Sequence, residues 1–251
     1  MSRIISVHAF KGGSGKTTIT ANLAARLAAG GSRVGIIDAD FRAPGMRVLL
    51  GLPAPRPQRT LNHYLWHEAE LEEVIYPAPM DNLPGQIILI PASGTLEDIR
   101  RMSKEGYDTG LLHNGIKALT TQERLDFLLV DTQPGVEENT LLMAVSSDLL
   151  LITACPDYQD LNGTRLLMQA IYRLAEPQIA LLVNKTSPTS QPERLRKIAR
   201  EHLDLDILSI LPLADAIIEK AGRSLFVLEH PDHPWSQAID DLAEHLLALR
   251  A

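Results

Sequence analysis

The chain reads Phe10-Lys11-Gly12-Gly13-Ser14-Gly15-Lys16-Thr17-Thr18 near its beginning, and this stretch indicates a phosphate site and the fold around it. An apolar run, residues 4–9, precedes it, and an Ala- and Leu-rich run, residues 19–29, follows it. Strand, glycine-rich loop and helix in this order are the context in which such a motif binds phosphate. The glycines let the backbone turn tightly and direct several N–H groups at one anion, and the positive end of the helix adds to their field. We expect Lys16 to reach the terminal phosphates and the Thr17 hydroxyl to ligate Mg²⁺.

The loop departs from the common phosphate-loop pattern at its first position. G-x-x-x-x-G-K-[ST] needs glycine at position 10, where this chain has Phe10, and a second lysine, Lys11, follows. This version, K-G-G-x-G-K-T-T, resembles the deviant Walker A motif of the MinD/ParA family of ATPases. The resemblance implies an ATP-dependent homodimer in which Lys11 of each copy reaches the nucleotide held by the other. The alternative is that Lys11 is an ordinary solvated loop lysine. The expected nucleotide-binding residues of the loop are Lys11, Gly12, Gly13, Ser14, Gly15, Lys16, Thr17 and Thr18.

The composition is that of an ordinary globular chain. We expect its 251 residues to form one domain, 1–251, with a sizeable core. No apolar run is long enough for a transmembrane helix, and the N-terminus has no signal-peptide pattern. The single cysteine, Cys155, excludes an internal disulfide and fits a cytoplasmic location. It also excludes relatives that need paired cysteines for an iron–sulfur cluster or a zinc site. The net charge of −7 means that only a local basic patch would attract nucleic acid.

Apolar β-rich runs alternate with helical patterns along the chain. This alternation predicts an α/β fold with a mostly parallel central sheet and helices on both faces. The resemblance implies the P-loop NTPase fold of the SIMIBI type. The stretch 52–59, with three prolines, reads as a surface excursion. The expected strands are 3–9, 33–38, 86–91, 127–131, 149–154, 179–184 and 207–211, and the expected helices lie near 17–29, 96–119, 137–146, 159–174, 191–202, 213–221 and 235–249.

Acidic residues end two of the expected strands. Asp131 closes Leu128-Leu129-Val130, and an acid in this position holds Mg²⁺ in the Walker B role. Asp38 and Asp40 end the strand 33–38 with a spacing that places two carboxylates near one face of the pocket. The resemblance assigns Asp40 to orienting the attacking water and Asp38 to the magnesium sphere. The expected catalytic residues are thus Lys11, Lys16 and Asp40, and the expected metal ligands are Thr17, Asp38 and Asp131. For both acidic sites the plainer interpretation is a polar turn.

The residues after Asp131 resemble the family's switch loop, which senses the γ-phosphate. They are Gln133, Pro134 and Gly135, and Gly135 is expected to supply a backbone N–H to the phosphate. The family usually has proline or alanine where Gln133 stands. This departure bears on the rate of hydrolysis.

Two late segments resemble the elements that hold the base. Asn184 and Lys185 follow an apolar run, and an asparagine amide offers a donor and an acceptor that suit the adenine edge. The run that includes Pro212 and Leu213 resembles a second adenine-flanking loop, whose contacts would come largely from the backbone.

Two helical segments bear on the surface on which such a protein would act. In the terminal helix, Trp235, Ile239, Leu242, Leu246 and Leu249 share one face, while Asp240, Asp241 and Glu244 make the polar face acidic. Anionic lipids repel such a face, so we expect this helix to pack on the core, and a membrane partner is disfavoured. Nonspecific DNA is a possible partner through Arg194, Arg196, Lys197 and Arg200 on one expected helix. The alternative for this patch is a solvated helix face.

The function that these observations favour is an ATP-binding and hydrolysing switch with ATP and Mg²⁺ as cofactors. It would form an ATP-dependent homodimer, position or segregate a cargo, and hydrolyse ATP slowly until a protein partner activates it. Its expected location is the cytoplasm, at the nucleoid or peripherally at the membrane. Two alternatives remain open, namely a metabolic ATP-dependent ligase or synthetase of the same fold and a nucleotide-binding module with little hydrolysis.

Overall fold

The computed structural model describes residues 2–52, 58–80, 82–219 and 224–249, and its strands form one sheet. The strands are β1 (Arg3–His8), β2 (Arg33–Ala39), β3 (Tyr76–Pro77), β4 (Gln86–Ile90), β5 (Phe127–Thr132), β6 (Leu149–Ala154), β7 (Ile179–Thr186) and β8 (Ile207–Pro212). The helices are α1 (Lys16–Ala29), α2 (Met46–Leu49), α3 (Leu61–Leu65), the 3₁₀ helix η1 (Leu71–Val74), α4 (Leu96–Glu105), α5 (Thr109–Gln122), α6 (Glu138–Val145), α7 (Tyr158–Leu174), α8 (Pro192–Leu203), α9 (Asp215–Glu219), α10 (Phe226–Glu229) and α11 (Pro234–Ala248).

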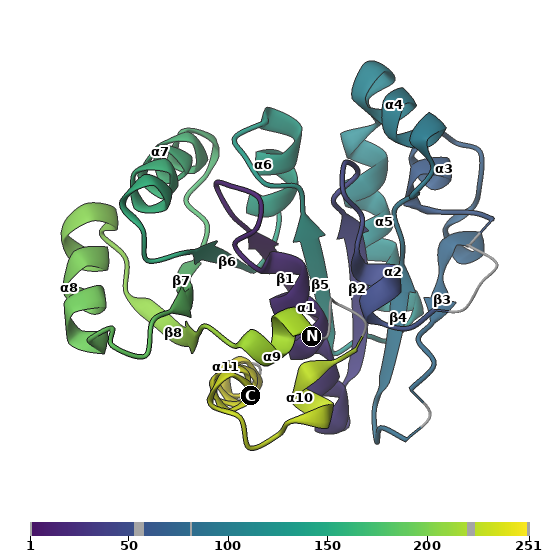
Figure 1. Ribbon diagram of the computed structural model, residues 1–251. Helices are drawn as coiled ribbons and strands as arrows, with labels where there is room; N and C mark the ends of the chain where they lie inside the picture. The colour runs from purple at the N-terminus through teal and green to yellow at the C-terminus, as the bar shows by residue number, and fades with distance from the viewer. Residues whose placement is uncertain (1, 53–57, 81, 220–223, 250–251) are drawn as a thin grey trace.

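The order of the strands across the sheet is β3-β4-β2-β5-β1-β6-β7-β8, as Figure 1 shows. Every neighbouring pair is parallel except β3–β4, which is antiparallel. The predicted mostly parallel α/β sheet is therefore confirmed. β1, which leads into the glycine-rich loop, lies between β5 and β6.

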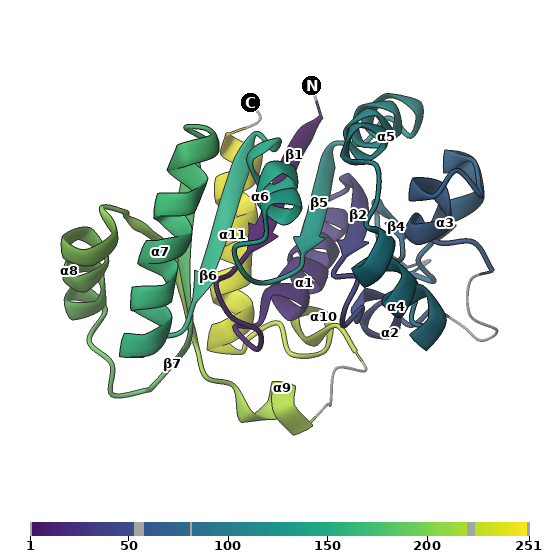
Figure 2. The same cartoon turned by 90° about the horizontal axis from the view of Figure 1, so that it is seen from above.

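Helices cover both faces of the sheet, with α1 and α11 on one face and α5 to α8 on the other (Figure 2). The apolar strands serve both layers because successive side chains point to opposite faces. In β5, Leu128 and Val130 pack towards the α5 side, whereas Phe127 and Leu129 pack towards α1. α9 lies at the carboxyl-terminal edge of the parallel strands, where ligands bind in sheets of this kind (Figure 2).

The helix α11 packs on the core, as its sequence predicts. Trp235, Ile239, Leu242 and Leu246 are buried against α1 and the sheet. Their spacing places them on one side of the helix. Asp241 and Glu244 are exposed on the other side, whereas Asp240 pairs with Arg26 of α1. Within the part of the chain that the structure describes, no helix has the length and apolar character needed to cross a membrane.

Three expectations about secondary structure need correction or completion. The helix expected at 96–119 is two helices, because Gly106 at φ 69° ends α4 and the Asp108 carboxylate caps the first turn of α5. The helix expected at 213–221 is the shorter α9, and residues 220 and 221 lie outside the described residues. Of the proline-containing stretch 52–59, residues 53–57 also lie outside them. The sequence reading missed β3, a two-residue edge strand that contains Pro77.

Candidate functional site

A cleft of about 510 Å³ opens at the carboxyl ends of the strands, and most of the predicted site residues line it. It exposes the glycine-rich loop on one side and residues after β7 and β8 on the other. The predicted residues in its wall are Gly12, Gly13, Gly15, Lys16, Thr17, Thr18, Asp40, Gln133, Pro134, Asn184, Lys185, Pro212 and Leu213. The sequence reading did not assign Arg42, Ala43, Ala214, Ile217, Ile218 and Trp235, which also line it.

Two carbonyls of the glycine-rich loop are turned towards β7. Asn184 donates from Nδ2 to the Ser14 carbonyl at 2.8 Å, and Lys185 donates from Nζ to the Gly13 carbonyl at 2.6 Å. In a planar trans peptide the next N–H points the opposite way, so the N–H groups of Ser14 and Gly15 point away from β7. Asn184 and Lys185 thus shape the loop into an anion-binding concavity.

The helix α1 begins at the loop without a side-chain cap. Gly15 occupies the N-cap position at φ 98°, and no acidic residue lies in the first turn. By contrast, Thr95, Asp108 and Asp157 cap α4, α5 and α7 with their side chains. Because the first N–H groups of a helix need acceptors, the uncapped end of α1 favours an anion there. Gly15 is also required sterically, since a Cβ would lie 2.2 Å from Asn184 Nδ2.

Asp38 and Asp131 are neighbours across two parallel strands. They stand in register between β2 and β5, and both are buried. Backbone N–H groups of Asp40 and Met46 donate to the two carboxylate oxygens of Asp38. Burial, and then the charge of Asp131, raise the pKa of the Asp38 carboxyl well above its ordinary value. This register brings the two acids together at the carboxyl ends of the strands.

The surroundings of Asp131 fit a divalent cation. Both of its carboxylate oxygens are buried and lack a hydrogen-bond partner among the described residues. Burial raises the pKa of Asp131 to about 7. The nearby Thr17 hydroxyl, which is not in hydrogen-bond geometry, and the charge of Lys16 lower this pKa only in part. Mg²⁺ prefers oxygen ligands and would supply the missing counter-charge, so Asp131, Asp38 and the Thr17 hydroxyl suit it. When bound there, Mg²⁺ would neutralise charge on the phosphates.

Asp40 and the segment after Asp131 form the rim of the cleft. Asp40 is buried, and its Oδ1 accepts from the N–H groups of Arg42 and Ala43 at 3.3 Å and 3.0 Å. Gln133 donates from Nε2 to Glu137 at 3.1 Å, and Glu137 also pairs with Arg42. Gln133 therefore joins the two rim segments through Glu137, a contact that proline or alanine at this position would lack.

The expected N–H donor of the switch loop already has a partner. Gly135 donates its N–H to the Ala9 carbonyl at 3.0 Å, so a contact with phosphate requires this hydrogen bond to open. His8, which the sequence reading treated only as a strand residue, lies with Nε2 2.9 Å from the Gly135 carbonyl. The signal that pointed to it was a titratable residue in the mostly apolar run of residues 4–9.

Phe10 and Lys11 point away from the cleft towards α7. Lys11 donates from Nζ to Asp157 at 2.8 Å and lies 3.9 Å from Asp160, and the hydrogen bond to Asp157 raises its pKa. The Phe10 ring fills the notch at Gly163, where a Cβ would lie 2.0 Å from Phe10 Cδ1. Lys11 is thus a predicted phosphate contact whose ammonium group lies outside the cleft, bound to Asp157 of the same chain.

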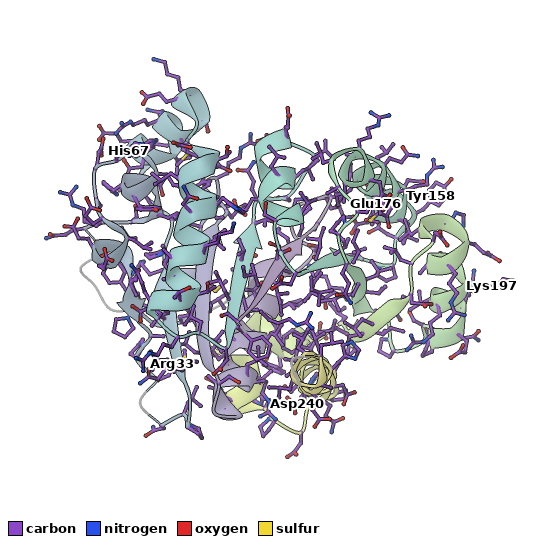
Figure 3. The ribbon with its side chains drawn as sticks, turned by 180° about the vertical axis from the view of Figure 1, so that it is seen from behind. Arg33, His67, Tyr158, Glu176, Lys197 and Asp240 are labelled. Carbon is purple, nitrogen blue, oxygen red and sulfur yellow. The ribbon has the colours of Figure 1, made fainter. Side chains whose placement is uncertain are left out.

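The predicted basic patch lies on α8 with most of its charge already engaged. Lys197, which Figure 3 shows at the edge of the molecule, lies 3.7 Å from Glu201. Arg200 pairs with Asp206 at 2.6 Å, and Arg196 donates to the Ile207 carbonyl at 2.7 Å. Arg194 is exposed.

Known proteins resemble this chain in sequence and in fold. A family model described as an AAA domain matches residues 2–182. An uncharacterized ATP-binding protein of Methanocaldococcus jannaschii is 29% identical in an alignment that covers 100% of this chain and 89% of that protein. The flagellum site-determining protein YlxH of Helicobacter pylori is 27% identical over 98% of this chain and 82% of its own length. The structure of the septum site-determining protein MinD from Pyrococcus horikoshii, complexed with Mg-ADP, superposes with a TM-score of 0.82 at 26% identity, covering 100% of this chain and 99% of that one.

The matched region contains the glycine-rich loop, both acidic strand ends and the switch loop, and the sheet carries them in the arrangement described above. This chain therefore belongs to the MinD/ParA family of P-loop ATPases, which use ATP with Mg²⁺.

Proposed function

We propose that this protein is an ATP-dependent switch that positions a cellular cargo. Two copies would associate face to face when each holds ATP and Mg²⁺, and hydrolysis would return them to monomers. Relatives whose names describe them as determining a flagellum site or a septum site support a positioning role. The proposed place of action is the cytoplasm, where ATP is available.

The position of Lys11 is the observation that carries the proposal. Its ammonium rests on Asp157, outside the cleft that holds the other predicted phosphate contacts. The side chain is one-third exposed, so it is free to exchange Asp157 for an acceptor on another molecule. An ion pair at this exposure is worth only about 0–1 kcal/mol, which a triphosphate on a second copy would easily exceed.

Hydrolysis would require a water held near Asp40, in line with the leaving phosphate. Asp40 lines the cleft and is fixed by two backbone N–H groups, which leaves its second carboxylate oxygen for such a water. We propose that turnover is slow without a protein partner, because Gln133 and Arg42 hold the rim through Glu137.

The test is the oligomeric state of the protein with nucleotide. Asp40→Ala with Mg-ATP should elute and scatter light as a dimer, and the same variant with Mg-ADP should be a monomer. Adding Lys11→Ala should abolish the dimer while ATP binding, measured by calorimetry, is retained. A protein that binds ATP and stays monomeric in every case would contradict the dimeric switch.

For the surface on which the dimer acts, we propose nonspecific DNA in preference to a membrane. The exposed face of α11 is acidic, whereas α8 carries Arg194 and the partly neutralised Lys197 and Arg200. A dimer would present two such helices, and two weak contacts on one duplex reinforce each other. A gel shift with ATP-loaded Asp40→Ala, run beside liposome flotation, decides between the two surfaces.

A further inference from the structure

His8 is a buried titratable residue for which the proposed function has no use. It is the last residue of β1, is fully buried, and is separated from the glycine-rich loop by Ala9. Its ring contacts the strand β5 and the switch loop at once. Nδ1 lies 2.6 Å from Thr132 Oγ1, and Nε2 lies 2.9 Å from the Gly135 carbonyl.

The partners of the ring fix where its proton lies. A carbonyl only accepts, so Nε2 carries the hydrogen and donates it to Gly135. Burial, opposed by that same hydrogen bond and aided by the Lys16 charge, lowers the pKa of His8 to about 4. The Thr132 hydroxyl has one hydrogen and two acceptors within reach, the Val7 carbonyl at 2.8 Å and His8 Nδ1 at 2.6 Å. Because the neutral ring carries its single hydrogen on Nε2, the hydroxyl must turn its hydrogen from Val7 to Nδ1 in this state.

Both peptide groups that flank Gly135 are thus held from the β1 side. Its N–H donates to the Ala9 carbonyl at 3.0 Å, and its carbonyl accepts from His8. Gly135 has φ 117°, a conformation in which residues with a side chain are strained. In this arrangement its N–H is committed to Ala9, so turning that N–H to a phosphate breaks this hydrogen bond and displaces the residue whose carbonyl His8 holds.

We propose that His8 is a positioning residue that holds the switch loop in the arrangement suited to a nucleotide without a γ-phosphate. The inference rests on the proposed function, because it assumes a nucleotide in the cleft. A γ-phosphate stabilises the opened switch loop through the contacts that the phosphate makes with that loop. Opening costs the hydrogen bond between His8 and the Gly135 carbonyl, so His8 opposes it. Weakening that hydrogen bond therefore increases the preference for ATP over ADP.

Two substitutions separate the contacts of the ring. The amide of asparagine ends near the position of Nδ1, so His8→Asn keeps a partner for Thr132 and loses the hydrogen bond to Gly135. The longer glutamine places its amide near the position of Nε2, so His8→Gln retains a donor to Gly135. The affinities of the two variants and the unchanged protein for Mg-ADP and for a non-hydrolysable Mg-ATP analogue are measured by calorimetry.

In His8→Asn the ratio of analogue affinity to ADP affinity should rise about two- to tenfold, the range that one net hydrogen bond represents. In His8→Gln the ratio should stay within about twofold of the original. A merely structural role would lower both affinities together and leave the ratio unchanged, and an unchanged or reduced ratio in His8→Asn would overturn the proposal. If the unchanged protein bound neither nucleotide, the proposed function would fall, and this inference with it.

A measurement on the unchanged protein covers the case in which His8→Asn does not fold. With ¹⁵N-labelled histidine, the Nε2 proton of His8 should give a slowly exchanging signal in the free and ADP-bound protein. The ATP analogue should shift this signal or abolish it. A signal that persists unchanged in all three states would overturn the proposal.

Discussion

Lys11 donates from Nζ to Asp157 Oδ2 at 2.8 Å, so the first lysine of the phosphate loop rests on the N-cap residue of α7. The two residues are 146 positions apart in the chain. Their contact therefore ties the side chain of Lys11 to the first turn of α7. Any movement of Lys11 to another molecule must first break it.

Replacing Asp157→Asn should therefore strengthen the proposed ATP-dependent dimer. Asparagine still caps the helix, while the ion pair that retains Lys11 is lost. We expect the dimer dissociation constant, measured by sedimentation with a non-hydrolysable ATP analogue, to fall about two- to fivefold, as for an exposed ion pair. Asp206→Asn, which removes the exposed partner of Arg200, is the matched control and should have no effect. Weaker association of Asp157→Asn would show that Asp157 supports the dimer instead.

The variant Lys16→Ala should lose nucleotide affinity. Lys16 is buried at the floor of the cleft, and charge-assisted contacts to phosphate are worth about 1.5–3 kcal/mol. Calorimetry should show affinity for Mg-ATP reduced by about 10- to 100-fold. Lys185→Ala, which removes the hydrogen bond to the Gly13 carbonyl, should have a smaller effect because it only supports the loop. Equal losses in the two variants would contradict a direct contact of Lys16 with phosphate.

The variant Asp131→Asn should be more stable than the unchanged protein but should lose the magnesium dependence of ATP binding. Its carboxyl has a pKa of about 7 in the folded protein against an ordinary 3.8, so at pH 8 the folded state bears an unpaired buried charge. Removing that charge should raise the free energy of unfolding without Mg²⁺ by roughly 4 kcal/mol at pH 8. The gain should vanish as the pH falls from 7 towards 4, because the native carboxyl is then protonated. ATP binding by the same variant should no longer depend on Mg²⁺, which calorimetry at two Mg²⁺ concentrations checks.

The pH dependence of stability should carry a signature of His8. Its pKa is about 4 when folded against an ordinary 6.5, so the unfolded chain binds a proton in that interval and the folded protein does not. Stability should fall as the pH drops from about 6.5 to about 4, by about 3 kcal/mol from this residue. His8→Gln lacks this titration, and urea unfolding of the two proteins at pH 7 and pH 4.5 measures the difference. Parallel pH profiles would mean that His8 titrates normally.

The sequence was sufficient to predict features that depend on a local motif or on the direction of the strands. The glycine-rich loop needs glycine at position 15 for both its backbone angle and its approach to Asn184, and this requirement is visible in the motif. Continuous apolar runs predicted strands covered on both faces, and the carboxyl ends of parallel strands then place Asp38 beside Asp131. The wall of the cleft was thus largely predictable.

What the sequence did not supply depends on long-range packing. Asp157 as the partner of Lys11, and Gly135 as the partner of His8, follow from the register of β1 against β5 and β6, which local patterns do not fix. The break between α4 and α5 had a local signal in Gly106 and Asp108, but the surrounding helical pattern outweighed it. Sequence motifs therefore predicted most residues that line the cleft and missed the hydrogen bonds of Lys11 and His8.

The notch at Gly163 has a consequence for how this chain varies among its relatives. An aromatic ring at position 10 fits only while position 163 carries no side chain. The two sites should therefore change as a pair, with a small residue at 10 wherever 163 is larger. An alignment of relatives would reveal this covariation between position 10, at the start of the phosphate loop, and position 163 in α7.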